Sequence, residues 1–446
     1  MLALILVATA ALSYVLPAGE FERVEVDGRL RVVPGSYHAV GPHPVTLLEL
    51  LRSLPLGFAA ASPVVYVILA SGIMFGAMER TGAVEHAVGA LVGRVGDRGR
   101  TGVIVAVTFL YGALGVVVGY ENNIAMVPIA AVLALALGGD LILAAGLSVG
   151  AITVGFGVSP FNPYTVGIGH QLAGLPIFSG WVLRALLCTG ALAGLAAYNV
   201  RYYRRLRAGR TSLGADLDAE GLRLTLPLAD YRLGRRHALV LASFAGGIAV
   251  MLWGVFTQSW FLNEISAVFI ATTIVIGVAG GLSADGLAAN ALRSVAVVAP
   301  GAFLVGLANA VRVVMETGLI GDTITHALAG ALEGLPPAAA AVGMVGAQSV
   351  INFLIPSGSG QALATLPVMV PVGDLLGLTR QVTVLAFQLG DGITNLVNPT
   401  LGGLVAMLAM CRVPFDRWLR FAVPYVAGLA AVALLVLVAA VLFGYR

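Results

Sequence analysis

The chain has 446 residues, of which 59% are hydrophobic and 11% are charged, with a net charge of +3 and a mean hydropathy of +0.96. Soluble domains carry about 25% charged residues, so the composition excludes a soluble enzyme, a disordered protein and a nucleic-acid-binding protein. Glycine, which lets membrane helices approach closely, accounts for 57 residues. The sequence therefore predicts an all-α polytopic membrane protein in a lipid bilayer, with no nucleic-acid partner.

The first segment, residues 1–56, predicts one short apolar helix followed by a polar stretch on the outer side. The apolar run of residues 1–16 is shorter than the ~20 residues of a typical span. Alternating side chains from Val24 to Val33, around Asp27–Gly28, indicate a β-hairpin. An exposed loop is an equally good interpretation of the same residues.

Apolar stretches bounded by charge, proline or glycine continue along the rest of the chain. Several are too short to cross a bilayer alone, and the short ones come in pairs. This pattern predicts a first repeat at 57–200, with a re-entrant hairpin at about 101–138 and a broken helix at about 141–175. A linker at 201–236 and scaffold helices at 237–293 follow. The second repeat is expected at 294–446, with a hairpin at about 337–374 and a broken helix at about 380–411.

Arginine positions orient these spans. All 25 basic residues are arginine, and the linker 201–236 holds nine of them against four acidic residues. Because cytoplasmic loops are enriched in basic residues, the linker is expected in the cytoplasm. The N-terminus is then also cytoplasmic, and the protein is a multi-pass protein of the cytoplasmic (inner) membrane.

Two short motifs recur at one spacing. Gly318 follows Gly82, and Asn398 follows Asn162, by the same 236 residues, within similar hydropathy patterns. An odd number of crossings before the second copy inverts its orientation in the membrane. Inverted-topology repeats with discontinuous helices are the architecture of secondary transporters, whose sites form near the bilayer midplane.

Four polar interruptions, two in each repeat, predict the substrate and ion site. Glycine, proline and small polar residues at such breaks leave backbone groups open to a ligand. The candidate binding residues are Glu121, Asn122, Asn123, Ser159, Asn162, Pro163, Thr165, Ser357, Gly358, Ser359, Gly360, Asp391, Thr394, Asn395, Asn398, Pro399 and Thr400.

The expected coupling ion is Na⁺ or H⁺. Candidate Na⁺ ligands are Asn122, Asn162, Ser359 and Asn398. No cofactor and no other metal are expected, because the two cysteines are isolated and the six histidines lack metal-binding spacing.

Charged residues at membrane depth are costly and usually functional. Glu121 and Asp391 could bind an ammonium group, hold Na⁺ or carry a proton. Arg312 could meet a substrate carboxylate. The alternative is that Arg312 or Arg184 forms a structural ion pair with one of the two acids.

Four longer motifs are distinctive: residues 15–21, 162–167, 351–362 and 387–395. They resemble the YfcC-like branch of the anaerobic C4-dicarboxylate carrier (DcuC) family, in the ion-transporter superfamily. The resemblance implies two inverted repeats, a scaffold domain, a homodimer and an elevator-type movement. It also implies dicarboxylate substrates or, for this branch, basic amino-acid antiport.

These observations predict a secondary active transporter for a small carboxylate-bearing metabolite. Two acids facing a dianion would be unfavourable, so an amino acid is preferred and a C4-dicarboxylate carrier coupled to Na⁺ or H⁺ is the alternative. A passive channel and an intramembrane hydrolase are remote alternatives. The G-x-S-x-G match at residues 146–150 lies in a glycine-rich membrane helix rather than a strand-to-helix turn, so no enzyme is expected.

Overall fold

The protein is described by a computed structural model that covers residues 2–26, 29–211, 213–227, 230–258 and 260–446. The described residues are mostly helical, and eight of their helices are long and apolar enough to cross a membrane. The eight are Leu47–Arg80 (α2), Ala83–Val118 (α3), Trp181–Arg207 (α8), Arg235–Gln258 (α9), Leu262–Ala279 (α10), Ala284–Thr317 (α11), Pro337–Leu354 (α13) and Phe415–Leu442 (α17).

The N-terminal segment forms a short helix and four short strands. Helix α1 spans Leu2–Leu12, and the strands are β1 (Gly19–Glu20), β2 (Arg23–Val26), β3 (Arg29–Val32) and β4 (His38–Ala39). Strand β2 pairs with β3 and β1 with β4, both antiparallel. The pairing of β2 with β3 lies where a hairpin was expected, and the turn at residues 27–28 lies outside the described residues.

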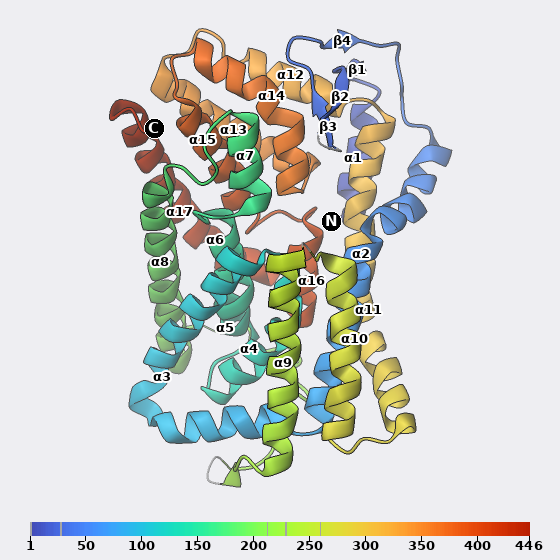
Figure 1. Ribbon diagram of the computed structural model, residues 1–446, viewed down its shortest axis with the longest axis vertical. Helices are drawn as coiled ribbons and strands as arrows, with labels where there is room; N and C mark the ends of the chain where they lie inside the picture. The colour runs from blue at the N-terminus through green and yellow to red at the C-terminus, as the bar shows by residue number, and fades with distance from the viewer. Residues whose placement is uncertain (1, 27–28, 212, 228–229, 259) are drawn as a thin grey trace.

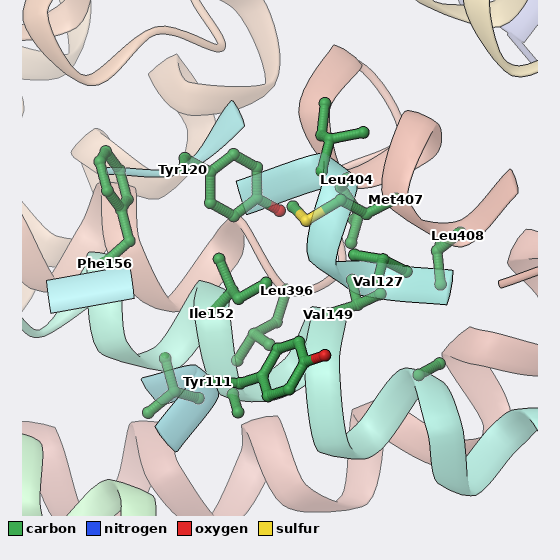
Figure 2. Close-up of a cluster of buried hydrophobic side chains, with 14 of the residues drawn as sticks. Tyr111, Tyr120, Val127, Val149, Ile152, Phe156, Leu396, Leu404, Met407 and Leu408 are labelled. Atoms are coloured by element: carbon green, nitrogen blue, oxygen red, sulfur yellow. The ribbon is translucent and has the colours of Figure 1, made fainter. Parts of the chain in front are cut away.

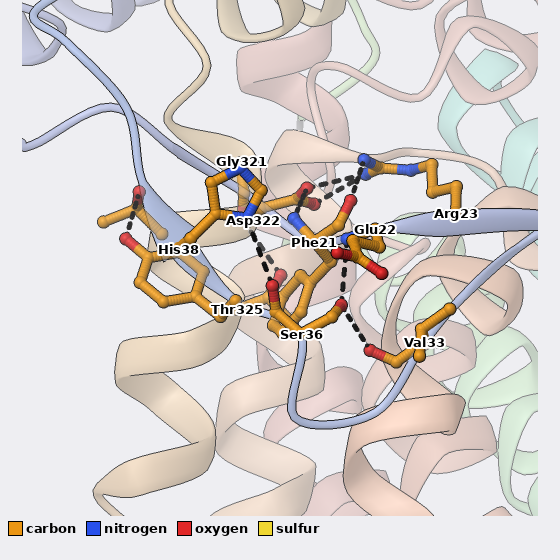
Figure 3. A network of polar contacts seen from close by, with 11 residues as sticks. Phe21, Glu22, Arg23, Val33, Ser36, His38, Gly321, Asp322 and Thr325 are labelled. Atoms are coloured by element: carbon orange, nitrogen blue, oxygen red, sulfur yellow. Dashed lines mark hydrogen bonds and ion pairs between the residues drawn. The ribbon is translucent and has the colours of Figure 1, made fainter.

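Asp322 ties this hairpin to helix α12 (Gly321–Gly330) (Figure 3). The Asp322 carboxylate accepts a hydrogen bond of 3.0 Å from the Phe21 N–H and bonds of 2.8 Å from the Arg23 guanidinium. Nearby, the rings of Tyr37 and His326 stack with centroids 4.1 Å apart. The strands thus rest on the second half of the chain.

Helices α2, α10 and α11 lie side by side at the right of Figure 1, with α9 packed on α10. The Thr46 side chain and Glu49 form a capping box that starts α2, and the Ser283 side chain caps α11. Residues 57 and 294, where repeat boundaries were expected, fall inside these helices. Hydropathy detects only the apolar part of each helix, whereas its caps set where it begins.

The expected linker is likewise shorter than 201–236. Helix α8 continues to Arg207, and α9 begins at Arg235. Tyr202 and Tyr203 remain buried on the inner face of α8, which extends the helix beyond its apolar part.

Where the hairpins and broken helices were expected, the structure has helices together with short 3₁₀ or π segments. In the first half they are the 3₁₀ segment η1 (Glu121–Met126), α4 (Val127–Ala136), α5 (Leu141–Ala145), the π segments η2 (Gly146–Gly150) and η3 (Pro163–Gly167), α6 (Ala151–Gly157) and α7 (Ile168–Leu172). In the second half they are α13, α14 (Gly358–Leu375), α15 (Arg380–Thr394) and α16 (Gly402–Met410).

The first arms of the two broken helices cross at glycine. A Cβ atom added to Gly392 would lie 2.2 Å from the Gly157 carbonyl oxygen, and one added to Gly157 would lie 2.6 Å from the Gly392 oxygen. Helices α6 and α15 therefore touch backbone to backbone. A buried apolar cluster that includes Tyr111, Ile152 and Leu396 fills part of the interior (Figure 2).

Candidate functional site

A cavity of about 280 Å³ lies where the interruptions of the two halves meet helices α2, α10 and α11. We call these three helices the scaffold, a different set from the expected scaffold helices at 237–293. The lining residues come from hairpin tips, breaks and spans far apart in sequence. From the hairpins and broken helices they include Tyr120, Glu121, Asn122, Phe156, Tyr164, Pro356, Ser357, Gly358, Ser359, Asn395, Thr400, Gly402 and Gly403. We call this space the central cavity.

The scaffold supplies the opposite wall of the central cavity. Pro63 of α2, Phe261 at the start of α10, and Asn309 and Arg312 of α11 line it. Among the described lining residues, Glu121 and Arg312 are the only charged ones. The cavity therefore offers one acid, on the first hairpin tip, and one base, on the scaffold.

The first hairpin tip turns at Gly119, whose φ of 104° is accessible to glycine at little cost. The Asn123 side chain donates to the Gly119 carbonyl at 2.5 Å and is buried, so it holds the tip together. The Tyr120 hydroxyl bonds Thr153 Oγ1 at 3.0 Å. Asn122 and Glu121 face the cavity, and Glu121 forms no ion pair with any described residue.

The second hairpin tip is shorter than the polar run 356–361 predicts. Ser357 caps α14 by accepting a bond from the Gly360 N–H, so the helix already begins at Gly358. Gly358 and Ser359 therefore present the N-terminus of a helix to the cavity, while Gly360 lines a neighbouring space instead. Exposed N–H groups at a helix N-terminus favour an anion.

The first broken helix is held open by Asn162. Its Nδ2 donates to the Phe156 carbonyl at 3.1 Å, and its Oδ1 accepts from the N–H groups of Tyr164 and Thr165 at 2.9 and 3.3 Å. Pro163 begins the following π segment, and Ser159 Oγ accepts from the Phe161 N–H. Asn162 and Ser159 are buried in this turn and do not line the central cavity.

The second broken helix opens later than expected. Residues 391–394 remain helical, because no proline interrupts the chain until Pro399. Asn398 then bridges the break: its Nδ2 donates to the Asn352 carbonyl at 2.8 Å, and its Oδ1 accepts from the N–H of Thr400 at 2.9 Å. Thr394 Oγ1 accepts a bond of 2.8 Å from Asn352 Nδ2.

Asp391 lies directly behind the second hairpin tip rather than on the cavity wall. A Cβ atom added to Gly358 would be 3.6 Å from Asp391 Oδ2 and 2.5 Å from Thr165 Cγ2. Asp391 is 1% exposed, and its Oδ1 has no hydrogen-bond partner among the described residues. Thr165 Oγ1 and Asn352 Oδ1 likewise find no partner in that part of the chain. Asp391 and Thr165 lie beside the start of α14, and Asn352 Nδ2 donates to the Asp391 carbonyl at 3.0 Å. Buried oxygens without partners in this region could receive a proton or a small cation.

The two hairpin tips pack in a reciprocal way. The tip of the first half lies against the start of α16, since a Cβ on Gly403 would be 2.7 Å from Tyr120 Cδ1 and 3.2 Å from Glu121 Cγ. The tip of the second half, at Gly358, lies against Thr165 in the second arm of the first broken helix. Each tip thus contacts the second arm of the other half's broken helix.

The two arginines singled out by sequence have different surroundings. Arg312 Nε lies 3.5 Å from Glu316 Oε1, one turn along α11. The buried Arg184 donates to the side-chain oxygens of Gln388 and Gln381, both at 3.0 Å. Among the described residues neither arginine pairs with Glu121 or Asp391, so the structural ion pair that was the alternative interpretation does not form in this conformation.

A second cavity of about 420 Å³ lies between the N-terminal strands, α11 and the second hairpin. Arg23, Asp322 and Glu316 line it, and Arg312 lines both this cavity and the central one. Arg312 therefore stands between the central cavity and the strand-covered side of the molecule.

Sequence reasoning located part of the cavity wall. The candidate residues that line the central cavity are Glu121, Asn122, Ser357, Gly358, Ser359, Asn395 and Thr400, together with Arg312. The candidates that do not line it are Asn123, Ser159, Asn162, Pro163, Thr165, Gly360, Asp391, Thr394, Asn398 and Pro399. Asn309 and the aromatic residues Tyr120, Tyr164 and Phe261 went unrecognised. A polar residue one helical turn before Arg312 was the available indication for Asn309.

Comparison with known proteins supplies a family. Residues 1–442 match the family model for the C4-dicarboxylate anaerobic carrier (DcuC). The chain is 32% identical over 412 residues to the "Putative basic amino acid antiporter YfcC" of Escherichia coli strain K12, covering 87% of this chain and 79% of that protein. It is 30% identical over 414 residues to a protein of Haemophilus influenzae named only as uncharacterized, covering 91% of this chain and 81% of that protein.

Similarity to solved structures is weaker. The YdaH transporter of Alcanivorax borkumensis is 16% identical, with a TM-score of 0.47, over 100% of this chain and 98% of that chain. MtrF of Neisseria gonorrhoeae is 17% identical, with a TM-score of 0.44, over 99% of this chain and 94% of that chain.

Proposed function

Since this chain belongs to the C4-dicarboxylate anaerobic carrier family, a family of transporters and not of enzymes, we propose that it moves a small carboxylate-bearing metabolite by secondary active transport. The protein is a multi-pass membrane protein. We propose that it lies in the cytoplasmic (inner) membrane with its arginine-rich face toward the cytoplasm. The central cavity, lined from both halves of the chain, is the observation that supports a binding site over an open pore.

We propose that the two halves are inverted-topology repeats. The reciprocal packing of the hairpin tips supports this, as does the crossing of α6 and α15 at Gly157 and Gly392. In Figure 1, helices α13 and α14 of the second hairpin lie in the upper part of the molecule, and helix α4 of the first hairpin lies in the lower part. Hairpins that enter from opposite sides are consistent with two oppositely inserted halves. The homodimer expected from the resemblance stays a prediction.

Alternating access would follow from movement of the hairpins and broken helices against the scaffold. The central cavity lies between these two units, so a vertical shift of one unit past α2, α10 and α11 would carry the site across the membrane. Arg312 on the scaffold would then meet the substrate in only part of the cycle. This elevator-type movement is our proposal for the mechanism.

An amino acid is the substrate class that best fits the charges of the cavity. Arg312 and the N-termini of α14 and α16, at Gly358 and Gly402, favour a carboxylate, and Glu121 favours an ammonium group. A C4-dicarboxylate would place its second carboxylate near Glu121, which is unfavourable without an intervening cation. The dicarboxylate remains the alternative, with basic amino acids tested first.

We assign the coupling ion to the space around Asp391. A buried carboxylate with an unsatisfied oxygen is costly unless a proton or cation neutralises it. Thr165 Oγ1 and Asn352 Oδ1 could complete a Na⁺ site, whereas a proton would need Asp391 alone. Gly358 lines the cavity and also lies close to Asp391, so ion occupancy could set the position of the second hairpin tip.

The first prediction identifies the substrate class. Among amino acids and dicarboxylates, an amino acid is expected to raise the apparent melting temperature of the purified protein by several degrees, because ligand at about 100 times its Kd stabilises by about 2.7 kcal/mol. The Glu121→Gln variant should lose this shift. The exposed Glu333, away from the cavity, supplies the matched control Glu333→Gln, which should keep it.

The same measurement separates the alternatives. Stabilisation by dicarboxylates alone would overturn the amino-acid assignment and support the second candidate. An equal shift in Glu121→Gln and in the unaltered protein would remove Glu121 from the site.

A further inference from the structure

A long apolar groove runs along the outer surface between α8 and α17, away from the central cavity. It has a volume of about 760 Å³, and the two helices lie together at the left edge of Figure 1. Leu186 and Val432 on its rim are 68% and 53% exposed, so the groove faces the bilayer rather than the interior. Apolar lining of this kind suits hydrocarbon chains.

Glycines form the floor of the groove. A Cβ atom added to Gly190 of α8 or to Gly428 of α17 would have no atom within 4 Å. Larger side chains at these positions would therefore fill the groove without displacing the neighbouring helix. The groove exists because side chains are missing on both helices at this level.

The α8 side of the groove is one continuous helix face. Residues at intervals of three and four, from Leu183 through Gly190 and Gly194 to Arg201, line it. From Leu186 to Arg201 the helix rises about 22 Å, which is enough to lay an acyl chain along one leaflet of a bilayer with a core of ~30 Å. The apolar part of this face ends at Arg201.

Basic residues continue the same face beyond the groove. A second hollow of about 360 Å³ shares Ala197 and Arg201 with the groove and adds Arg204, Arg205 and Arg210. All four arginines are exposed, and none forms an ion pair with a described residue. Four uncompensated positive charges therefore stand at one end of an apolar groove.

We propose that this surface binds an anionic phospholipid, with an acyl chain in the groove between α8 and α17 and the phosphate headgroup on Arg201, Arg204, Arg205 and Arg210. Charge complementarity selects the occupant, because basic pockets beside membrane helices bind anionic headgroups. A second copy of the chain fits poorly, since a two-fold axis along the membrane normal would bring two clusters of four arginines together.

The test compares lipids with one headgroup difference. Binding of phosphatidylglycerol and of phosphatidylcholine with the same acyl chains is measured on the purified full chain by native mass spectrometry, with glycerol phosphate as the chain-free probe. Phosphatidylglycerol is expected to bind more tightly than phosphatidylcholine, and glycerol phosphate is not expected to compete. Equal affinity for the two lipids, or full competition by glycerol phosphate, would overturn the proposal.

Two variants test the two halves of the surface. Arg204→Ala/Arg205→Ala should weaken phosphatidylglycerol binding about thirtyfold, because each arginine at an anionic lipid surface contributes about a fivefold gain. The control Arg94→Ala/Arg98→Ala removes the same charge from exposed positions of α3 and should leave the affinity unchanged.

The variant Gly190→Leu should displace the acyl chain while preserving the apparent melting temperature measured without lipid. Unaltered lipid binding in Gly190→Leu would place the lipid elsewhere. A dimer in detergent that becomes a monomer on this substitution would assign the groove to a second copy and overturn the proposal.

Discussion

Replacing Asp391 with Asn is expected to abolish substrate accumulation driven by an ion gradient while exchange of substrate across the membrane persists. Asp391 is buried close to Gly358, and no residue in the described part of the chain gives its Oδ1 a hydrogen bond. Asparagine keeps the size of the side chain but can neither ionise nor release a proton. Accumulation in proteoliposomes under an imposed pH or Na⁺ gradient should therefore fall to the level of simple equilibration.

The Asp374→Asn variant is the matched control for this prediction. Asp374 is 41% exposed and pairs with Arg380 at 3.0 Å, so its loss should leave gradient-driven uptake intact. Thr165→Val separates the two coupling ions, because it removes a hydroxyl ligand that Na⁺ would need and a proton would not. Gradient-driven accumulation at the normal level in Asp391→Asn would exclude Asp391 as the coupling group.

Gly392→Ala is expected to destabilise the protein strongly. The added methyl would lie 2.2 Å from the Gly157 oxygen and 2.5 Å from the Gly157 Cα, both backbone atoms that cannot rotate away. Overpacking of this kind costs about 1–3 kcal/mol or more, because two helices must separate. The apparent melting temperature should drop by several degrees, and Gly157→Ala should have a similar effect.

Gly346 offers the control for this substitution. It lies in α13, and a Cβ there would meet nothing within 4 Å. Replacing glycine with alanine inside a helix raises the free energy of unfolding by about 0.5–1 kcal/mol, so Gly346→Ala should be neutral or stabilising. Equal melting temperatures for Gly392→Ala and Gly346→Ala would mean that α6 and α15 do not touch backbone to backbone.

The positions of the interruptions could be predicted because their causes are local. Pro163 and Pro399 remove helical donors, and Gly119 adopts a conformation that other residues avoid. The lengths of the interruptions were predicted less accurately than their positions. Ser357 caps α14 and pulls Gly358 into the helix, and Asp391 stays helical because nothing upstream of Pro399 breaks the chain.

The composition of the cavity wall depended on contacts between distant segments. Glu121 and Arg312 could be identified from sequence because charged residues are conspicuous in apolar segments, and both line the cavity. Asp391 stood out equally, yet it is buried beside Gly358 and does not line the cavity, which no spacing rule reveals. The sequence suggested Asn162 and Asn398 as ligands, whereas their side chains form hydrogen bonds to the backbone at the two helix breaks.

Counterflow in proteoliposomes tests most directly whether the central cavity is the substrate site of a carrier. The amino acid that stabilises the protein most is loaded inside, and uptake of its labelled form is followed with no ion gradient. We expect uptake that saturates with substrate concentration and is lost in Glu121→Gln and Arg312→Gln but kept in Glu333→Gln. Flux that rises linearly with the gradient, or saturable uptake at the normal rate in both cavity variants, would contradict the account.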